Sequence, residues 1–110
     1  MATVVYLSYA RHDKEGQPIP FNTSYYLNTH LPLAEKHWGP RGMQSWSVVQ
    51  FEEDDPSGLQ VQYITYWESK ECFDRAYAAM PTEYPELMQG LKHYTTAPPA
   101  KWVGKCLVRG

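Results

Sequence analysis

Residues 21–39 read F-N-T-S-Y-Y-L-N-T-H-L-P-L-A-E-K-H-W-G and hold the most informative pattern in the chain. A small polar side chain at any of positions 22–24 can accept a hydrogen bond from a free first-turn N–H, so a helix is predicted to begin there. Along that helix Tyr26 and His30 are one turn apart and share a face with Leu33 or Ala34. Gly39, with a proline behind it, is predicted to end the helix in a left-handed conformation.

Pro32 interrupts this predicted helix. A proline inside a helix has no N–H to donate and clashes with the carbonyl four residues earlier, here that of Asn28. The helix can respond with a kink, or a first turn can end near Thr29 and a new helix can begin with Pro32 in its first turn. In both cases the backbone beside His30 is irregular, and irregular backbone is a pointer to a functional site.

Length and charge set the broad class. The chain has 110 residues, which predicts one domain over 1–110, and its formal net charge of −2 leaves no basic footprint for nucleic acid. The N-terminus lacks a basic leader with a long apolar run, and no segment approaches the roughly 20 apolar residues of a membrane span. We therefore expect a soluble, cytoplasmic protein that binds neither nucleic acid nor membrane.

Cofactor and metal motifs are not found in the sequence. The two cysteines, Cys72 and Cys106, form no C-x-x-C, so we expect reduced thiols rather than a disulfide. There is no zinc or haem spacing, no phosphate-binding glycine loop and no nucleophile elbow. Any chemistry is therefore predicted to proceed without a metal or a bound cofactor.

The other elements follow from side-chain alternation and from capping and turn residues. They are strands over 3–10, 42–51, 59–67, 91–96 and 102–108, a hairpin turn over 52–58, a helix from Ser69 to Pro81 and a shorter helix over 83–90. The order β-α-β-β-α-β predicts a ferredoxin-like α+β fold, an antiparallel sheet with both helices on one face. A bare second face predicts a homodimer, with the tail strand as a candidate to pair with the partner's sheet edge.

The run Y-Y-L-N-T-H-L-P-L-A, with W-G-P-R-G shortly after it, resembles the EthD family of dimeric α+β barrel proteins. The resemblance covers nearly the whole chain, and its most specific part is Tyr26, His30, Pro32 and Leu33 followed by Gly39 and Gly42. It implies a dimer with a cavity in each subunit between the helices and the sheet. It also implies a link to ethyl tert-butyl ether degradation, accessory to an oxygenase system, within a superfamily that includes polyketide cyclases, isomerases and cofactor-free monooxygenases.

His30 and Tyr26 are the candidate catalytic residues. The ordinary pKa of histidine, near 6.5, would let His30 take a proton from a substrate carbon at neutral pH and return it. Tyr26 could hold the developing enolate oxygen by a hydrogen bond. The competing explanation is structural, with the ring nitrogens of His30 satisfied by a tyrosine and a backbone carbonyl at a helix kink.

Substrate contacts are expected from the aromatic side chains, which make up 15% of the residues and include nine Tyr and four Trp. Such a load serves core packing or a pocket for a flat or apolar small molecule. Tyr63 and Trp67 share one face of the strand over 59–67 and are candidate binding residues, with packing as the alternative. His93 begins the strand over 91–96 and would line the same cavity if its side chain points toward the helices.

Three classes of function fit these residues. The first is a cofactor-independent lyase, isomerase or monooxygenase-like enzyme for an aromatic, carbonyl or ether compound, with His30 as acid and base. The second is a carrier that binds such a compound unchanged. The third is a structural partner in a degradation complex whose working surface lies outside the barrel.

Overall fold

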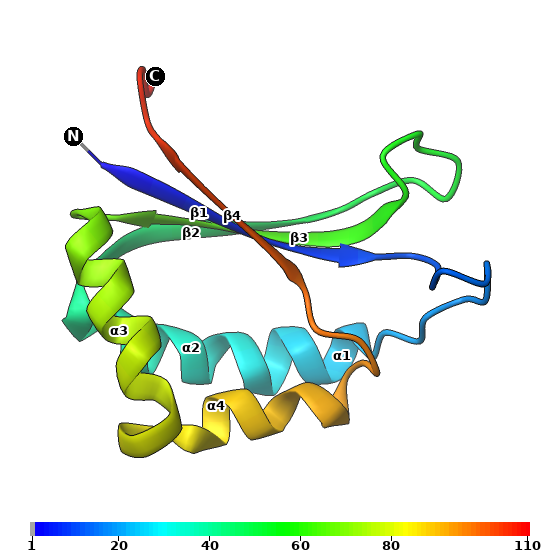
Figure 1. The fold of residues 1–110 in the computed structure, drawn as a ribbon, viewed down its shortest axis with the longest axis horizontal. Coiled ribbons are helices and arrows are strands. Elements are labelled where there is room, and N and C mark those ends of the chain that lie inside the picture. Colours follow the sequence, from blue (N-terminus) through cyan, green and yellow to red (C-terminus); the bar gives the residue numbers. More distant parts are fainter. Residues whose placement is uncertain (1) are drawn as a thin grey trace.

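The computed structural model describes residues 2–110 and shows one antiparallel sheet with all helices packed on one of its faces (Figure 1). The strands are β1 (Thr3–Ala10), β2 (Met43–Gln50), β3 (Leu59–Trp67) and β4 (Ala100–Lys105), in the sheet order β2-β3-β1-β4. The helical segments are α1 (Thr23–Tyr25), a π turn (Tyr26–His30), α2 (Leu31–Trp38), a 3-10 turn (Gly39–Arg41), α3 (Lys70–Glu83), α4 (Pro85–Gln89) and a second 3-10 turn (Gly90–His93). The α+β, ferredoxin-like fold and the hairpin between β2 and β3 are as predicted.

The first helical segment begins at the expected polar cap, where the Asn22 side chain accepts from the Tyr25 N–H at 3.0 Å. The Leu31 N–H then bonds to the carbonyl of Tyr26, five residues back, which defines the π turn. Helix α2 begins at Leu31 with Pro32 in its first turn, where proline is tolerated. The backbone stays helical through His30 and Leu31, so the helix does not end and restart as the second predicted arrangement had it. A π turn, which neither arrangement included, accommodates Pro32, and the irregular backbone lies beside His30.

The π turn changes which side chains of this segment enter the core. The buried residues are Tyr26, Leu31, Ala34 and Trp38, whose first spacing is five residues instead of three or four. Leu31 therefore takes the core position one turn after Tyr26 that the helical spacing had assigned to His30. His30 is displaced to the edge of the core and is only partly buried.

Gly42, and not Gly39, takes the left-handed conformation after α2. Gly39 keeps a helical φ of −54° and leads into the 3-10 turn, whereas Gly42 has φ 115°. A Cβ on residue 42 would lie 2.8 Å from Cβ of Cys72, so the close approach of this turn to α3 also requires glycine. The prediction that Gly39 adopts the left-handed conformation was wrong because the chain adds a 3-10 turn first.

Pro81 does not close the helix that Ser69 caps. Helix α3 continues to Glu83, and the Tyr84 N–H still bonds to the Met80 carbonyl at 3.2 Å. Because Pro81 lies in the last turn, its missing N–H removes a single bond and the helix continues past it. The shorter helix, α4, begins at Pro85, inside the range predicted for it.

The strand predicted over 91–96 does not form. Leu91 and Tyr94 are the two apolar side chains of this segment that pack toward the core, and their spacing of three residues fits a helical turn better than a strand. The fourth strand is β4, formed by residues expected to make a tail strand. It pairs with β1 of its own sheet, with Val103 opposite Val5, and forms one edge of that sheet.

Candidate functional site

A hollow of about 340 Å³ lies between the sheet and the helices, at the level of the second half of β1. Its walls come from β1, the end of the π turn, α2, α3, α4, the segment after α4 and the two prolines that precede β4. The lining residues are Leu7, Tyr9, His30, Trp38, Tyr77, Met80, Pro81, Leu87, Met88, Leu91, Tyr94, Pro98 and Pro99. We call this hollow the His30 cavity; its volume falls in the range of small-molecule sites.

A short chain of polar groups reaches the His30 cavity. The hydroxyls of Tyr9 and Tyr94 are hydrogen-bonded at 2.8 Å, and the Tyr94 hydroxyl lies 3.5 Å from Nε2 of His30. On the other side of the imidazole, a Cβ on Gly90 would come within 3.2 Å of Nδ1, so the ring lies against the backbone of that turn. The absence of a side chain at Gly90 thus leaves room for the imidazole.

The polar groups of the cavity are uncharged at neutral pH. Burial lowers the pKa of His30 from 6.5 to about 4. Burial, and then the neighbouring tyrosine hydroxyls, raise the pKa of Tyr9 and of Tyr94 well above the usual value of 10. None of the lining residues is an Asp, Glu, Lys or Arg. The cavity is therefore an apolar space with a neutral imidazole and neutral phenols as its titratable groups.

Tyr26 packs against the face of the His30 ring and does not line the cavity. The two rings are stacked with centroids 5.5 Å apart and planes 16° from parallel. Tyr26 is 1% exposed, and its hydroxyl has no hydrogen-bond partner within residues 2–110. The structure thus brings the two candidate catalytic residues together, but by ring stacking and not with both polar groups facing one space.

Tyr63 and Trp67 lie in the hydrophobic core, and neither lines the His30 cavity. The Tyr63 hydroxyl donates to the sulfur of Met43 at 3.8 Å, and the Trp67 Nε1–H donates to Oγ1 of Thr65 at 2.8 Å. Both polar atoms are used inside the fold. Core packing, the alternative weighed from the sequence, describes their positions.

His93 lies outside the His30 cavity. It is exposed at the end of the 3-10 turn Gly90–His93, where its ring lies 5.4 Å from that of Tyr25. It borders a separate hollow of about 390 Å³, which shares only Tyr94 with the His30 cavity. Because the predicted strand is a turn, the alternation used to orient His93 does not apply.

Tyr9 and Tyr94 are the cavity residues that the sequence did not single out. Tyr9 lies on β1 two residues after Leu7 and four after Val5, on the face that packs against the helices. That shared face was visible in the strand alternation and could have found it. Tyr94 gave no comparable signal, because the segment that carries it was predicted as a strand.

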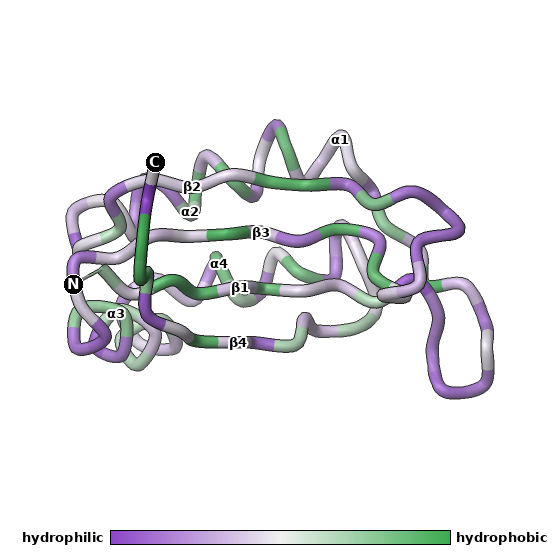
Figure 2. The backbone as a smooth tube through the Cα atoms, turned by 90° about the horizontal axis from the view of Figure 1, so that it is seen from above, coloured by the Kyte–Doolittle hydropathy of each residue, from purple (hydrophilic) through white to green (hydrophobic). Residues whose placement is uncertain are grey.

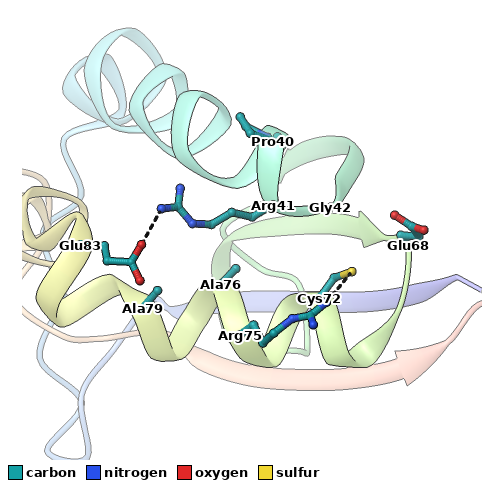
Figure 3. A pocket seen from close by; sticks show the side chains of 10 residues that line it. Pro40, Arg41, Gly42, Glu68, Cys72, Arg75, Ala76, Ala79 and Glu83 are labelled. Carbon is teal, nitrogen blue, oxygen red and sulfur yellow. Dashed lines mark hydrogen bonds and ion pairs between the residues drawn. The ribbon is translucent and has the colours of Figure 1, made fainter.

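A second hollow, of about 510 Å³, lies between α3 and the turn after α2 (Figure 3). Its two arginines already have neighbours of their own. The guanidinium of Arg41 lies 3.3 Å from the Glu83 carboxylate, and that of Arg75 lies 3.8 Å from the sulfur of Cys72. Each arginine is therefore engaged in the wall of the hollow, and we assign no site there.

Metal binding and membrane insertion are two further functions on which the described residues bear. Residues 2–110 contain no cluster of three or more His, Cys, Asp or Glu side chains arranged to hold a metal ion. In the same part of the chain, no helix has both the length and the apolar character of a membrane span.

Comparisons with known proteins support the fold. No family model and no curated protein sequence matches the chain. Among solved structures, an EthD-like protein from Ralstonia eutropha has a TM-score of 0.77 and 21% identity, with 99% of this chain and 95% of that chain covered. An EthD family protein from Bacillus halodurans has a TM-score of 0.64 and 19% identity, with 97% and 99% covered.

A third similar structure is that of SnoaB, described as a cofactor-independent oxygenase from Streptomyces nogalater. It has a TM-score of 0.64 and 10% identity, with 98% of this chain and 94% of that chain covered. At these identities the likeness concerns the fold, and chemistry differs widely among proteins of one fold. The resemblance noted in the sequence is confirmed at this level: the chain has the fold of the EthD-like proteins.

Proposed function

We propose that this protein binds a neutral aromatic, carbonyl or ether compound in the His30 cavity and assists a cofactor-independent proton transfer on it. The observation that carries the proposal is the composition of the cavity walls. A space of about 340 Å³ is lined by apolar groups, and His30 with its tyrosine neighbour supplies the reactive polar atoms.

The proposed ligand is neutral because the cavity offers no countercharge. Moving a carboxylate or an ammonium group from water into such a space costs several kcal/mol unless an opposite charge or several hydrogen bonds receive it. A flat ligand with one carbonyl or hydroxyl oxygen matches the apolar walls and the few polar atoms.

In the proposed step, neutral His30 accepts a proton from a carbon next to the ligand carbonyl and later returns it. The Tyr94 hydroxyl donates a hydrogen bond to the enolate oxygen that forms, while the Tyr9 hydroxyl hydrogen-bonds to Tyr94. Tyr26 is assigned a positioning role, because it stacks on the imidazole and does not line the cavity.

A second candidate function, a carrier that releases its ligand unchanged, is favoured by the lowered pKa of His30. An imidazole with a pKa of about 4 is a weaker base than an ordinary histidine. The same cavity would then serve binding alone.

Two of the similar solved structures come from proteins whose names point to such functions. SnoaB is described as a cofactor-independent oxygenase, and the Bacillus halodurans protein as a member of the ethyl tert-butyl ether D family. By the same likeness we propose membership of the EthD family and, as an alternative to catalysis, an accessory role beside an oxygenase system.

We also propose that the protein is a homodimer in which two sheets meet face to face. The face of the sheet away from the helices carries three rows of four residues, as the strand register shows. These rows are Ser45, Tyr66, Val4 and Gly104, then Ser47, Ile64, Tyr6 and Trp102, then Val49, Gln62, Ser8 and Ala100. All twelve are uncharged, although 20% of the chain is charged. Such a face suits burial against a second copy.

Binding is tested with 2-naphthol, which is neutral and fluorescent, against 2-naphthoate, which has the same rings and a negative charge. We expect 2-naphthol to bind and 2-naphthoate to bind at least about tenfold more weakly, because its charge would be buried unpaired. Equal affinity for both compounds would contradict the assignment of a neutral ligand.

Catalysis is tested by the uptake of deuterium at the acidic carbon of 2-tetralone, followed by NMR in D₂O. We expect the protein to accelerate exchange over buffer, His30→Gln to lose this acceleration, and His93→Gln to keep it, because His93 lies outside the cavity. Binding of 2-naphthol without any acceleration of exchange would favour the carrier.

A further inference from the structure

The C-terminal tail, residues 106–110, crosses the open face of the sheet instead of leaving it. Figure 1 shows the tail on the side of the sheet away from the helices, and Figure 2 shows it running from the end of β4 across the neighbouring strands toward β2. It passes the strands in their order in the sheet, β4, β1, β3 and β2.

Specific contacts hold the tail at its start and near its end. The Cys106 N–H donates to the Ala2 carbonyl at 2.9 Å, one position beyond the Lys105–Thr3 pair, so this bond continues the ladder between β4 and β1. The guanidinium of Arg109 lies 3.8 Å from the centre of the Tyr66 ring on β3 and donates to the hydroxyl of Ser45 on β2 at 2.5 Å. A cation held over an aromatic face, with a hydrogen bond in addition, gives the tail a defined course.

The side of the tail that faces away from the sheet is apolar. Between the fixed residues Cys106 and Arg109 lie Leu107, 81% exposed, and Val108, 89% exposed. Trp102, 49% exposed, and Val49, 40% exposed, lie on the same face of the molecule. The tail is therefore held by its polar groups. Its two large apolar side chains are exposed on the face where a partner would pack.

The size of the sheet face fits a second copy of the chain. Four strands about 4.8 Å apart, with β1 eight residues long at about 3.4 Å per residue, give a footprint of about 500 Å². Each partner of a stable interface buries about 800 Å². A flat footprint is smaller than the accessible surface of the side chains that stand on it, so a face of this size is of the order that a stable dimer buries, and Leu107 and Val108 lie on it.

We infer that the tail is a built part of the interface with a second copy of this chain, in which Leu107 and Val108 pack against the partner. This inference rests on the homodimer proposed above. A second copy is the fitting occupant because the twelve strand residues of the face are uncharged, and the one charge that the tail brings to them, Arg109, is already held by Tyr66 and Ser45. In a two-fold dimer each of the two tails contacts the opposite subunit, so one substitution in the tail changes the interface at two places.

The test is sedimentation velocity of the full chain over a range of concentrations, with the double variant Leu107→Asp, Val108→Asp. Both side chains are almost fully exposed within one subunit, so its fold should remain, which far-UV circular dichroism checks. We expect the dimer dissociation constant to rise by at least about tenfold, because four aspartates would enter an apolar interface. Leu27→Asp, at a 47% exposed position in the helical layer, is the matched control and should leave the constant unchanged.

The outcomes separate the two proposals. A wild-type chain that stays monomeric at every concentration would overturn the homodimer and this inference with it. A wild-type dimer that the double variant matches in affinity would overturn the role of the tail alone. A dimer weakened equally by Leu27→Asp would also overturn it, since the effect would then not belong to the sheet face.

Discussion

The Tyr94 hydroxyl lies 3.5 Å from Nε2 of His30 and 2.8 Å from the Tyr9 hydroxyl, so one side chain joins the sheet to the imidazole of the helical layer. The two tyrosines are 85 residues apart in the chain. This arrangement connects the stability of the fold to the state of the cavity, and it can be tested one group at a time.

Tyr94→Phe should destabilise the protein. The substitution leaves the buried Tyr9 hydroxyl without its partner, and an unsatisfied buried hydroxyl costs about 1–2 kcal/mol in the free energy of unfolding. Urea denaturation measures the change. Tyr25→Phe is the control, because no hydrogen bond of the Tyr25 hydroxyl is found within residues 2–110, and it should change the free energy by less than about 0.5 kcal/mol.

Tyr26→Phe should leave the stability unchanged or raise it by up to about 1 kcal/mol, since the hydroxyl it removes is buried without a partner in the described chain. Tyr84→Phe is the matched contrast. The Tyr84 hydroxyl donates to the Ala76 carbonyl and accepts from Nε1 of Trp38, so its loss should cost about 2 kcal/mol. Thermal or urea unfolding of both variants checks the difference, and a large loss in Tyr26→Phe would show that its hydroxyl has a partner after all.

The free energy of unfolding should fall as the pH is lowered from about 6.5 toward 4. Burial places the pKa of His30 at about 4 in the folded protein, below its usual 6.5, so the unfolded chain binds the proton first. The contribution of neutral His30 is full above pH 6.5 and is lost by about pH 4, with a limit of about 3 kcal/mol.

His30→Gln should flatten this part of the pH profile, whereas His12→Gln, at an exposed position, should leave it intact. Titration of the His30 ring by NMR gives the pKa directly. A value near 6.5 in the folded protein would contradict the burial of the imidazole.

Gly90→Ala should disturb the imidazole directly. The added Cβ would lie 3.2 Å from Nδ1 of His30, so the ring must shift, and we expect weaker binding of 2-naphthol and a loss of about 1 kcal/mol of stability. Gly39→Ala is the control, because its Cβ meets no atom within 4 Å and its φ of −54° suits alanine. That variant should be neutral or more stable by about 0.5 kcal/mol, with binding unchanged.

The sheet and the first helix could be predicted because their signals are local. The alternation in β1, β2 and β3 and the polar cap at Asn22 depend on residues close in sequence. Pro32 likewise indicated the irregular backbone beside His30, since the conflict between proline and a helix is local too.

The walls of the cavity could not be predicted in the same way. Leu91 and Tyr94 can belong to a strand or to a turn, and the choice depends on the edge of β1, which pairs with β4 instead. Tyr63 and Trp67 were expected near the ligand, but the middle of the sheet is filled by the core, and the hollow lies nearer to Tyr9. Such outcomes depend on packing between distant segments.

The π turn at Tyr26–His30 has an evolutionary consequence. Asn28 and Thr29 are exposed, and removing one of them would shorten the spacing from Tyr26 to the next core leucine from five residues to four, that of an ordinary helix. The buried positions from that leucine to Trp38 would keep their mutual spacing. Loss or gain of a single codon in this turn could therefore remove or create the displaced histidine while the core of the fold stays the same, so close relatives that differ here by one residue in length would differ in their cavity.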